Sequence, residues 1–122
     1  TPFELEEWGL WLGARVADLP EAMRLRIDGF LTALALEFVG QLYLPAVQVA
    51  SGDKQRLTFF WSPKNAPWFL DVEFWGDGKC EWYYSPRVEA HWSSEGTDGE
   101  PEDHLPTARI FEILRRQFKE LP

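Results

Sequence analysis

The acidic residues Asp71, Glu73 and Glu81 and the histidine His91 are the side chains whose types and spacing could do chemistry. The three acids alternate with apolar residues along the stretch WFLDVEFWGDGKCEWYY, residues 68–84, and His91 follows in a later apolar stretch. Carboxylates one cross-strand step apart can share a proton, and together with an imidazole they can hold a divalent cation. One hypothesis is therefore a small-ligand-binding or enzymatic domain that uses these four side chains.

The same acids would also form the solvated outer face of a sheet whose other face is covered by helices. Lys79, Arg87 and Arg56 lie close enough in the predicted register to neutralise them. We therefore interpret the carboxylates first as a protein surface, and we assign no catalytic residue.

Other reactive groups in the sequence do not form a recognisable site. There are two histidines and one cysteine, and none of the spacings typical of a metal site is present. The predicted hairpin turns Cys80 inward, where a cysteine is usually an inert hydrophobe. The Gly-Asp-Gly turn lies inside that hairpin, whereas a phosphate loop joins a strand to a helix. We expect no metal and no cofactor.

The elements that position the acids can be derived from the hairpin turn. A three-residue loop with Gly78 in the left-handed conformation pairs Phe74 with Cys80 and Val72 with Trp82. Apolar residues then face apolar residues, whereas a slip of one residue would mix the two faces of the sheet. The predicted register therefore buries these four residues and places the acids on the opposite face.

The rest of the chain shows helical periodicity at both ends and a period of two in the middle. Helices are predicted over about 3–17, from the DLPEAM segment to about 43, and over about 107–120. Asp18 and Glu21 predict a capping box for the second helix, and Gly29 within it predicts a close helix crossing. The predicted strands are AVQVA, QRLTFFWS, WFLDVEFW, the second arm of the hairpin and RVEAHWS. The fold class is α+β: two N-terminal helices, an antiparallel meander of four or five strands, and a C-terminal helix on the same sheet face.

Composition limits the classes of function. The chain has 122 residues, which fits one domain over 1–122, and 45% hydrophobic with 26% charged residues is an ordinary globular balance. The net charge of −8 disfavours nucleic acids, whose phosphates attract Lys and Arg. Residues 93–105 are acidic and poor in apolar side chains, so we expect a mobile loop there. The single cysteine and the lack of a long apolar run indicate a cytoplasmic protein that does not enter a membrane.

Several apolar side chains have no place in the predicted core. Aromatic anchors with an acidic rim are typical of protein interfaces, where the rim speeds encounter with a basic partner. A second copy of the chain could cover the same groups, so a homodimer stays open. The side chains predicted to contact a protein partner are Phe3, Leu10, Trp11, Phe69, Trp75, Glu100, Glu102 and Asp103.

Two segments, LPAVQVASGDKQRLTFFW and FLDVEFWGDGKCEWYY, resemble parts of small acidic α+β proteins encoded by bacteria and phages. The likeness covers about forty residues and is one of architecture, namely a Pro-x-Val strand followed by a strand that ends near Trp and a hairpin. It implies no reaction and no site residues. Proteins of this size and charge are similar to immunity proteins, antitoxins and inhibitors of defence systems. The resemblance therefore implies a non-catalytic domain that binds and inhibits or neutralises a protein.

Overall fold

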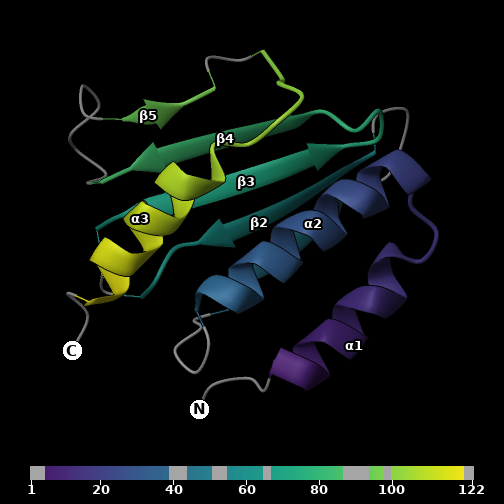
Figure 1. Ribbon diagram of the computed structural model, residues 1–122, viewed down its shortest axis with the longest axis horizontal. Helices are drawn as coiled ribbons and strands as arrows, with labels where there is room; N and C mark the ends of the chain where they lie inside the picture. The colour runs from purple at the N-terminus through teal and green to yellow at the C-terminus, as the bar shows by residue number, and fades with distance from the viewer. Residues whose placement is uncertain are drawn as a thin grey trace.

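The computed structural model describes residues 5–38, 44–50, 55–64, 67–86, 94–97 and 100–119. It shows an antiparallel sheet with all three helices of the described residues on one of its faces (Figure 1). The elements are α1 (Leu5–Val16), α2 (Glu21–Glu37), β1 (Ala46–Ala50), β2 (Arg56–Trp61), β3 (Phe69–Trp75), β4 (Cys80–Ser85), β5 (Glu95–Gly96) and α3 (Thr107–Lys119). This arrangement confirms the predicted α+β class, the antiparallel meander and the common face of the helices.

Each strand pairs with its neighbour in the sequence, in the order β1-β2-β3-β4-β5. In the β3–β4 hairpin Phe74 lies opposite Cys80 and Val72 opposite Trp82, as predicted. Gly78 has a φ of 89°, and the backbone N–H of Trp75 donates to the carbonyl of Lys79 at 2.8 Å. The turn and the apolar pattern therefore fix the register that was derived from the sequence.

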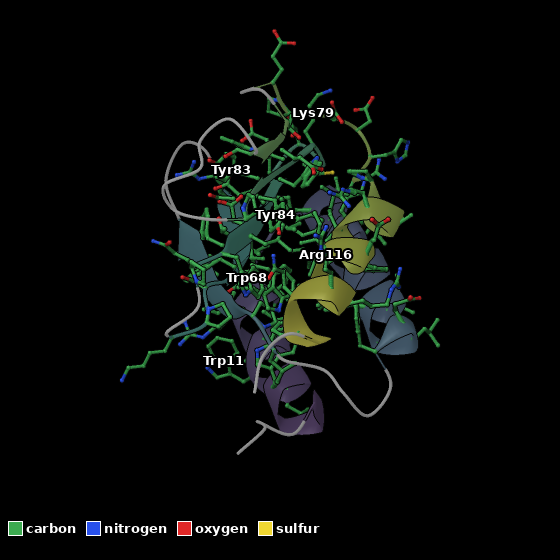
Figure 2. All side chains as sticks on the ribbon, turned by 90° about the vertical axis from the view of Figure 1, so that its left-hand side faces the viewer. Trp11, Trp68, Lys79, Tyr83, Tyr84 and Arg116 are labelled. Carbon is green, nitrogen blue, oxygen red and sulfur yellow. The ribbon has the colours of Figure 1, made fainter. Side chains whose placement is uncertain are left out.

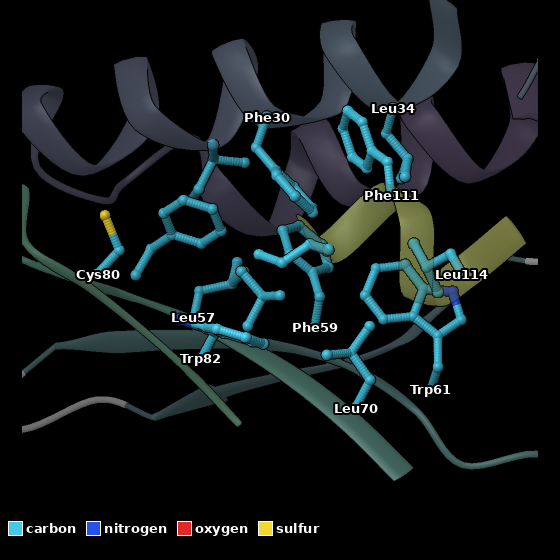
Figure 3. Close-up of a cluster of buried hydrophobic side chains, with 14 of the residues drawn as sticks. Phe30, Leu34, Leu57, Phe59, Trp61, Leu70, Cys80, Trp82, Phe111 and Leu114 are labelled. Carbon is cyan, nitrogen blue, oxygen red and sulfur yellow. The ribbon is translucent and has the colours of Figure 1, made fainter. Parts of the chain in front are cut away.

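The core lies between the sheet and the helices and consists largely of aromatic rings (Figure 3). Phe30 of α2 is at its centre, with ring centroids 6.0 Å from Phe59, 5.7 Å from Phe74 and 6.0 Å from Phe111. Offset and tilted rings at such separations add roughly 0.5–1.5 kcal/mol per pair to the free energy of burial. Aromatic side chains from β2, β3 and α3 thus join the three parts of the chain around α2.

Two predictions about α2 are wrong. Its N-cap is Pro20, and no side chain caps the helix, so the expected capping box of Asp18 and Glu21 does not form. A Cβ added at Gly29 would meet no atom within 4 Å, so this glycine does not mark a close helix crossing. The apolar stripe of α2 is correct, because Met23 and the residues that follow it at helical spacing are buried.

The sequence did not predict β5, which lies inside the range expected to be an acidic loop. Its two residues pair with Tyr83 and Tyr84 of β4. The predicted strand RVEAHWS, with His91, falls outside the described residues, as does residue 120. The second helix ends before the predicted residue of about 43, because α2 stops at Glu37 and its C-cap Phe38 has a non-helical φ of −116° and ψ of 41°. Among the described residues, no helix is long and apolar enough to cross a membrane.

Candidate functional site

The sheet face away from the helices carries the acids that the sequence singled out. Asp71 and Glu73 of β3 and Glu81 of β4 are half-buried, and they alternate with the buried residues of the same strands. Glu73 and Glu81 lie directly opposite each other in the ladder. Like charges in that position repel each other and destabilise a sheet. Three of the four residues predicted for the alternative ligand site therefore share one face, while His91 lies outside the described residues.

Asp71 is the most perturbed of the three acids. It lies opposite Phe60 of β2 on one side and Tyr83 of β4 on the other, so aromatic neighbours reduce its contact with water. This burial, followed by the charges of Glu73 and Glu81, raises the pKa of Asp71 to about 6, against a smaller lowering by a hydrogen bond from the backbone of Tyr83. Asp71 can therefore gain or lose a proton near neutral pH.

Glu73 and Glu81 form a coupled pair beside Asp71. Burial raises the pKa of Glu81 first, and the charge of Glu73 and a hydrogen bond to it add to that effect. The hydroxyl of Thr58 on β2 donates to Glu73 Oε1 at 3.1 Å. Glu73 therefore contacts both β2 and β4 across the sheet.

The cations expected to neutralise this cluster do so only in part. Lys79 instead pairs with Asp103, with Nζ 3.0 Å from Oδ1. The guanidinium carbon of Arg56 is 5.2 Å from the centre of the Trp75 ring. Arg56 lowers the pKa of Glu81, but its effect is the smallest of those acting on that group. Arg87 lies outside the described residues. Within the described chain, the charges of Glu73 and Glu81 still raise the pKa of Asp71, and Arg56 only weakly offsets the rise at Glu81.

Aromatic side chains flank the acids on the same face. Phe69 and Trp75 are half-buried at the two ends of β3, as their predicted places imply. The ring of Phe69 is 5.9 Å from that of Tyr83, which is 39% exposed and donates a hydrogen bond to Ser94. Figure 2 shows Tyr83 on the side of the sheet away from the helices and its neighbour Tyr84 on the helix side. We call Phe69, Asp71, Glu73, Trp75, Glu81 and Tyr83 the outer-face site.

Sequence reasoning missed Tyr83, although the predicted register contains the signal that would have found it. In that register Tyr83 lies opposite Asp71, so it shares the outer face. The predicted site residues Phe69 and Trp75 are thereby brought onto one surface with the acids of the alternative ligand site. The two hypotheses of partner binding and ligand binding therefore concern the same face.

The predicted contact residues on α1 lie elsewhere. Leu10 is 76% exposed, and Trp11 is 38% exposed with the guanidinium carbon of Arg15 4.5 Å from its ring centre. Phe3 lies outside the described residues. On α2, Leu25 and Leu36 are also exposed, which the sequence reasoning missed because both fall outside the buried stripe. The apolar groups of the helices thus do not join the outer-face site.

The acidic segment 100–106 is tied to the end of the hairpin. Cys80 and Glu102 exchange two backbone hydrogen bonds, of 2.7 and 2.8 Å, and Asp103 pairs with Lys79. The hydrogen bond and charge of Lys79 lower the pKa of Asp103. The acids of this segment are exposed, as the predicted rim requires, namely Glu100, Glu102 and Asp103. They form a third surface, separate from the outer-face site and from the exposed apolar residues of α1 and α2.

The geometry of the outer-face site suits a cationic side chain, such as that of Lys or Arg, better than a metal ion. No group of three or more His, Cys, Asp or Glu in the described residues is arranged to hold a metal ion. Half-buried carboxylates between aromatic rings can accept hydrogen bonds from a Lys or Arg side chain, whose stem packs on the rings.

Comparison of the chain with protein-family models, with curated proteins and with solved structures finds no match.

Proposed function

We propose that this chain is a non-catalytic, acidic protein-binding domain that contacts a basic partner through the outer-face site. The observation that carries the proposal is the direct opposition of Glu73 and Glu81 next to Asp71, without a described cation among them that neutralises all three. Such repulsion costs folding free energy, and natural proteins tolerate this kind of cost where a function needs it. A Lys or Arg from a partner would relieve it.

The aromatic flanks supply the apolar part of the interface. Tyr and Trp are enriched among residues that dominate binding energy, because a large ring is buried at a small entropic cost. Phe69 and Tyr83 pack against each other at one end of the acids, and Trp75 lies at the other end with Arg56 over it. The acids between them would select a basic segment and disfavour nucleic acid.

The mode of action that we propose is inhibition or neutralisation of the bound protein, as an immunity-type or anti-defence protein would act. The small size of the domain and its net charge of −8 support it. An acidic inhibitor can occupy a basic functional surface of its target and block access to it. The proposal needs no cofactor and no membrane.

The test uses a neutralised outer face of unchanged shape. The chain with Asp71→Asn, Glu73→Gln and Glu81→Gln is compared with the wild type in capture of partners from the cell that produces it, followed by calorimetric titration of the purified partner. We expect the affinity to fall by about tenfold or more, since charge pairs at a desolvated interface contribute strongly.

The matched control removes three exposed acids from other elements, with Glu21→Gln, Asp28→Asn and Glu112→Gln. It has the same net charge as the neutralised chain, and we expect its affinity to stay within about twofold of the wild type. Equal losses in both variants would show that net charge alone attracts the partner. An unchanged affinity in the neutralised chain would exclude the outer face as the binding surface.

A small-ligand or enzymatic role is the second candidate, and the pKa of about 6 at Asp71 is the observation that favours it. A carboxyl group that titrates near neutrality can act as a general acid or base. The discriminating result is a low-molecular-weight compound that raises the melting temperature of the wild type and fails to do so with Asp71→Asn. A specific ligand stabilises the folded state by mass action.

A further inference from the structure

Within the described residues, no strand pairs with the outer edge of β1. β1 stands at the end of the strand order, and within the described residues its ladder partners all belong to β2. Its five residues, Ala46–Ala50, include no charged residue, no proline and no glycine. Unpaired backbone groups on such a strand are a template for another strand, and proteins usually protect them with charge, proline or brevity. β1 has none of these protections.

The opposite edge of the sheet is protected. β5 has two residues, and Arg109 of α3 donates to its Glu95 from Nε at 2.8 Å. At Gly96 a side chain would collide with the backbone carbonyl of Trp82. The β5 edge is therefore two residues long and charged, whereas β1 is five residues long and neutral, and the difference points to a role for β1.

The sequence of β1 reads the same in both directions, Ala-Val-Gln-Val-Ala. When two copies pair antiparallel with Gln48 opposite Gln48, each Val47 lies opposite Val49 of the other copy. Residues directly opposite each other share one face of an antiparallel sheet, and in this chain Val47 and Val49 pack against the core whereas Gln48 is exposed. The pairing therefore continues both faces of the sheet without an offset. Self-complementarity of this kind is what a two-fold interface requires.

We propose that β1 pairs with β1 of a second copy, antiparallel about a two-fold axis at Gln48, so that the two sheets become one. The neutrality of the strand supports a second copy as the occupant. Each chain carries a net charge of −8, and an edge free of acids allows two such chains to approach without like charges facing each other across the ladder. A basic partner, by contrast, would gain nothing from this edge.

Trp11 of α1 offers further apolar surface for the contact. A stable interface buries roughly 1,200–2,000 Å², more than a five-residue ladder supplies. In Figure 1 the strands run from β5 to β2 toward α1, so β1 follows on that side of the sheet. Figure 2 shows Trp11 projecting from α1 toward the side where the sheet lies. Its exposed ring would supply part of the remaining area.

The test places charge at the two-fold axis. Gln48→Lys and Gln48→Glu each set two like charges opposite each other in the dimer, while the exposed side chain leaves the single chain intact. Light scattering after size exclusion, over a series of concentrations, should give a wild-type mass of twice the 14.2 kDa of the chain. Each variant alone should give the mass of one chain, with an unchanged circular dichroism spectrum.

Mixing the two variants provides the decisive measurement. With an affinity tag on one of them, Gln48→Lys and Gln48→Glu should combine into a mixed dimer, because opposite charges now meet at the axis. Thr32→Glu, an exposed change on α2, is the control and should remain a dimer. A monomeric wild type at every concentration, a dimer that persists in either Gln48 variant, or failure of the mixed pair to form would overturn the proposal. Gln48 lies in the same cross-strand row as Thr58, Glu73 and Glu81. The mass measurements therefore use the purified chain alone, so that their outcome does not depend on the proposed partner.

Discussion

The raised pKa of Asp71 makes the stability of the fold depend on pH. An aspartate on an exposed strand would ordinarily be hydrated, but here Phe60 and Tyr83 lie on either side of it and two glutamates are near. The folded-state pKa of about 6 is above the ordinary value of 3.8. The native state therefore binds more protons than the unfolded state between these values, and its stability falls as the pH rises through that window.

We expect Asp71→Asn to stabilise the fold at pH 7.5, where the wild-type carboxylate is charged. The gain should be on the order of 1 kcal/mol, since solvent screening reduces the effect of a part-exposed group. It should shrink as the pH falls and disappear below about pH 3, where Asp71 is protonated in both states. Urea unfolding at a series of pH values measures this dependence. An equal gain at pH 4 and pH 7.5 would show that charge is not its cause.

Neighbouring residues of β3 and β4 should differ sharply in their effect on stability. Phe74 and Trp82 are buried on the helix side, whereas Glu73 is half-buried on the outer face. Phe74→Ala or Trp82→Ala should lower the free energy of unfolding by roughly 3–5 kcal/mol, and Glu73→Ala should change it by less than about 1 kcal/mol. Denaturation midpoints test this contrast, and similar losses in all three variants would contradict the assignment of the two faces.

Divalent cations should not stabilise the fold through the acids. We expect Mg²⁺, Ca²⁺, Mn²⁺ or Zn²⁺ at millimolar levels to leave the melting temperature nearly unchanged, because a specific site would raise it by mass action. A rise of several degrees that is lost in Glu73→Ala or Glu81→Ala would contradict this expectation. That outcome would also place the ligand hypothesis ahead of the protein-binding one.

At the level of elements, α2 contains a glycine that packing does not require. A Cβ at Gly29 would enter open space, and the residue is exposed in the middle of the helix. Gly29→Ala should therefore stabilise the fold by about 0.5–1 kcal/mol, because alanine loses less conformational freedom on forming a helix. Thermal unfolding measures the change. Gly78→Ala is the contrasting variant, since its φ of 89° disfavours a side chain, and it should destabilise the fold.

The hairpin could be derived from the sequence because two independent constraints agree there. Gly78 selects the turn, and the alternation around Phe74 and Trp82 selects the same register. β5 could not be derived, since its pairing depends on contacts with β4 and Arg109, which no local pattern encodes. Nor could the sequence predict that Lys79 pairs with Asp103 and not with the outer acids. That pairing depends on where segment 100–106 crosses the end of the hairpin.

For the candidate site, the sequence predicted which side chains share the outer face but not how strongly they interact. The alternation placed Asp71, Glu73 and Glu81 together, and the structure agrees. The pKa of Asp71 depends on how Phe60 and Tyr83 limit its contact with water, which is a property of packing across three strands. Spacing along the sequence carries no such information.

At the scale of the whole molecule, the described helices leave one sheet face without helical cover, and the net charge is −8. Long-range attraction should therefore control the rate at which a basic partner arrives. We expect the association rate constant to fall as salt rises, since charges act over about 8–10 Å near physiological ionic strength. Stopped-flow mixing with the purified partner measures it.

Charge reversal in the acidic segment separates steering from contact. Glu100→Lys with Glu102→Lys should slow association while the dissociation rate changes little, because both residues are exposed and lie away from the outer-face site. Asp103→Lys also breaks the pair with Lys79, so its effect should be compared with its loss of stability. A rate constant that is insensitive to salt and to both reversals would contradict steering by this segment.

The central position of Phe30 also has a consequence for the order in which the chain is synthesised. Its ring partners Phe59, Phe74 and Phe111 all follow it in the sequence, and the last of them belongs to the final helix. A ribosome therefore releases the apolar stripe of α2 well before the residues that will cover it. The strands can pair one after another as they emerge, because each neighbours the previous one. Until then α1 is the one described element that precedes α2 and can cover it, so the unfinished chain is most exposed to aggregation while its sheet is still being made.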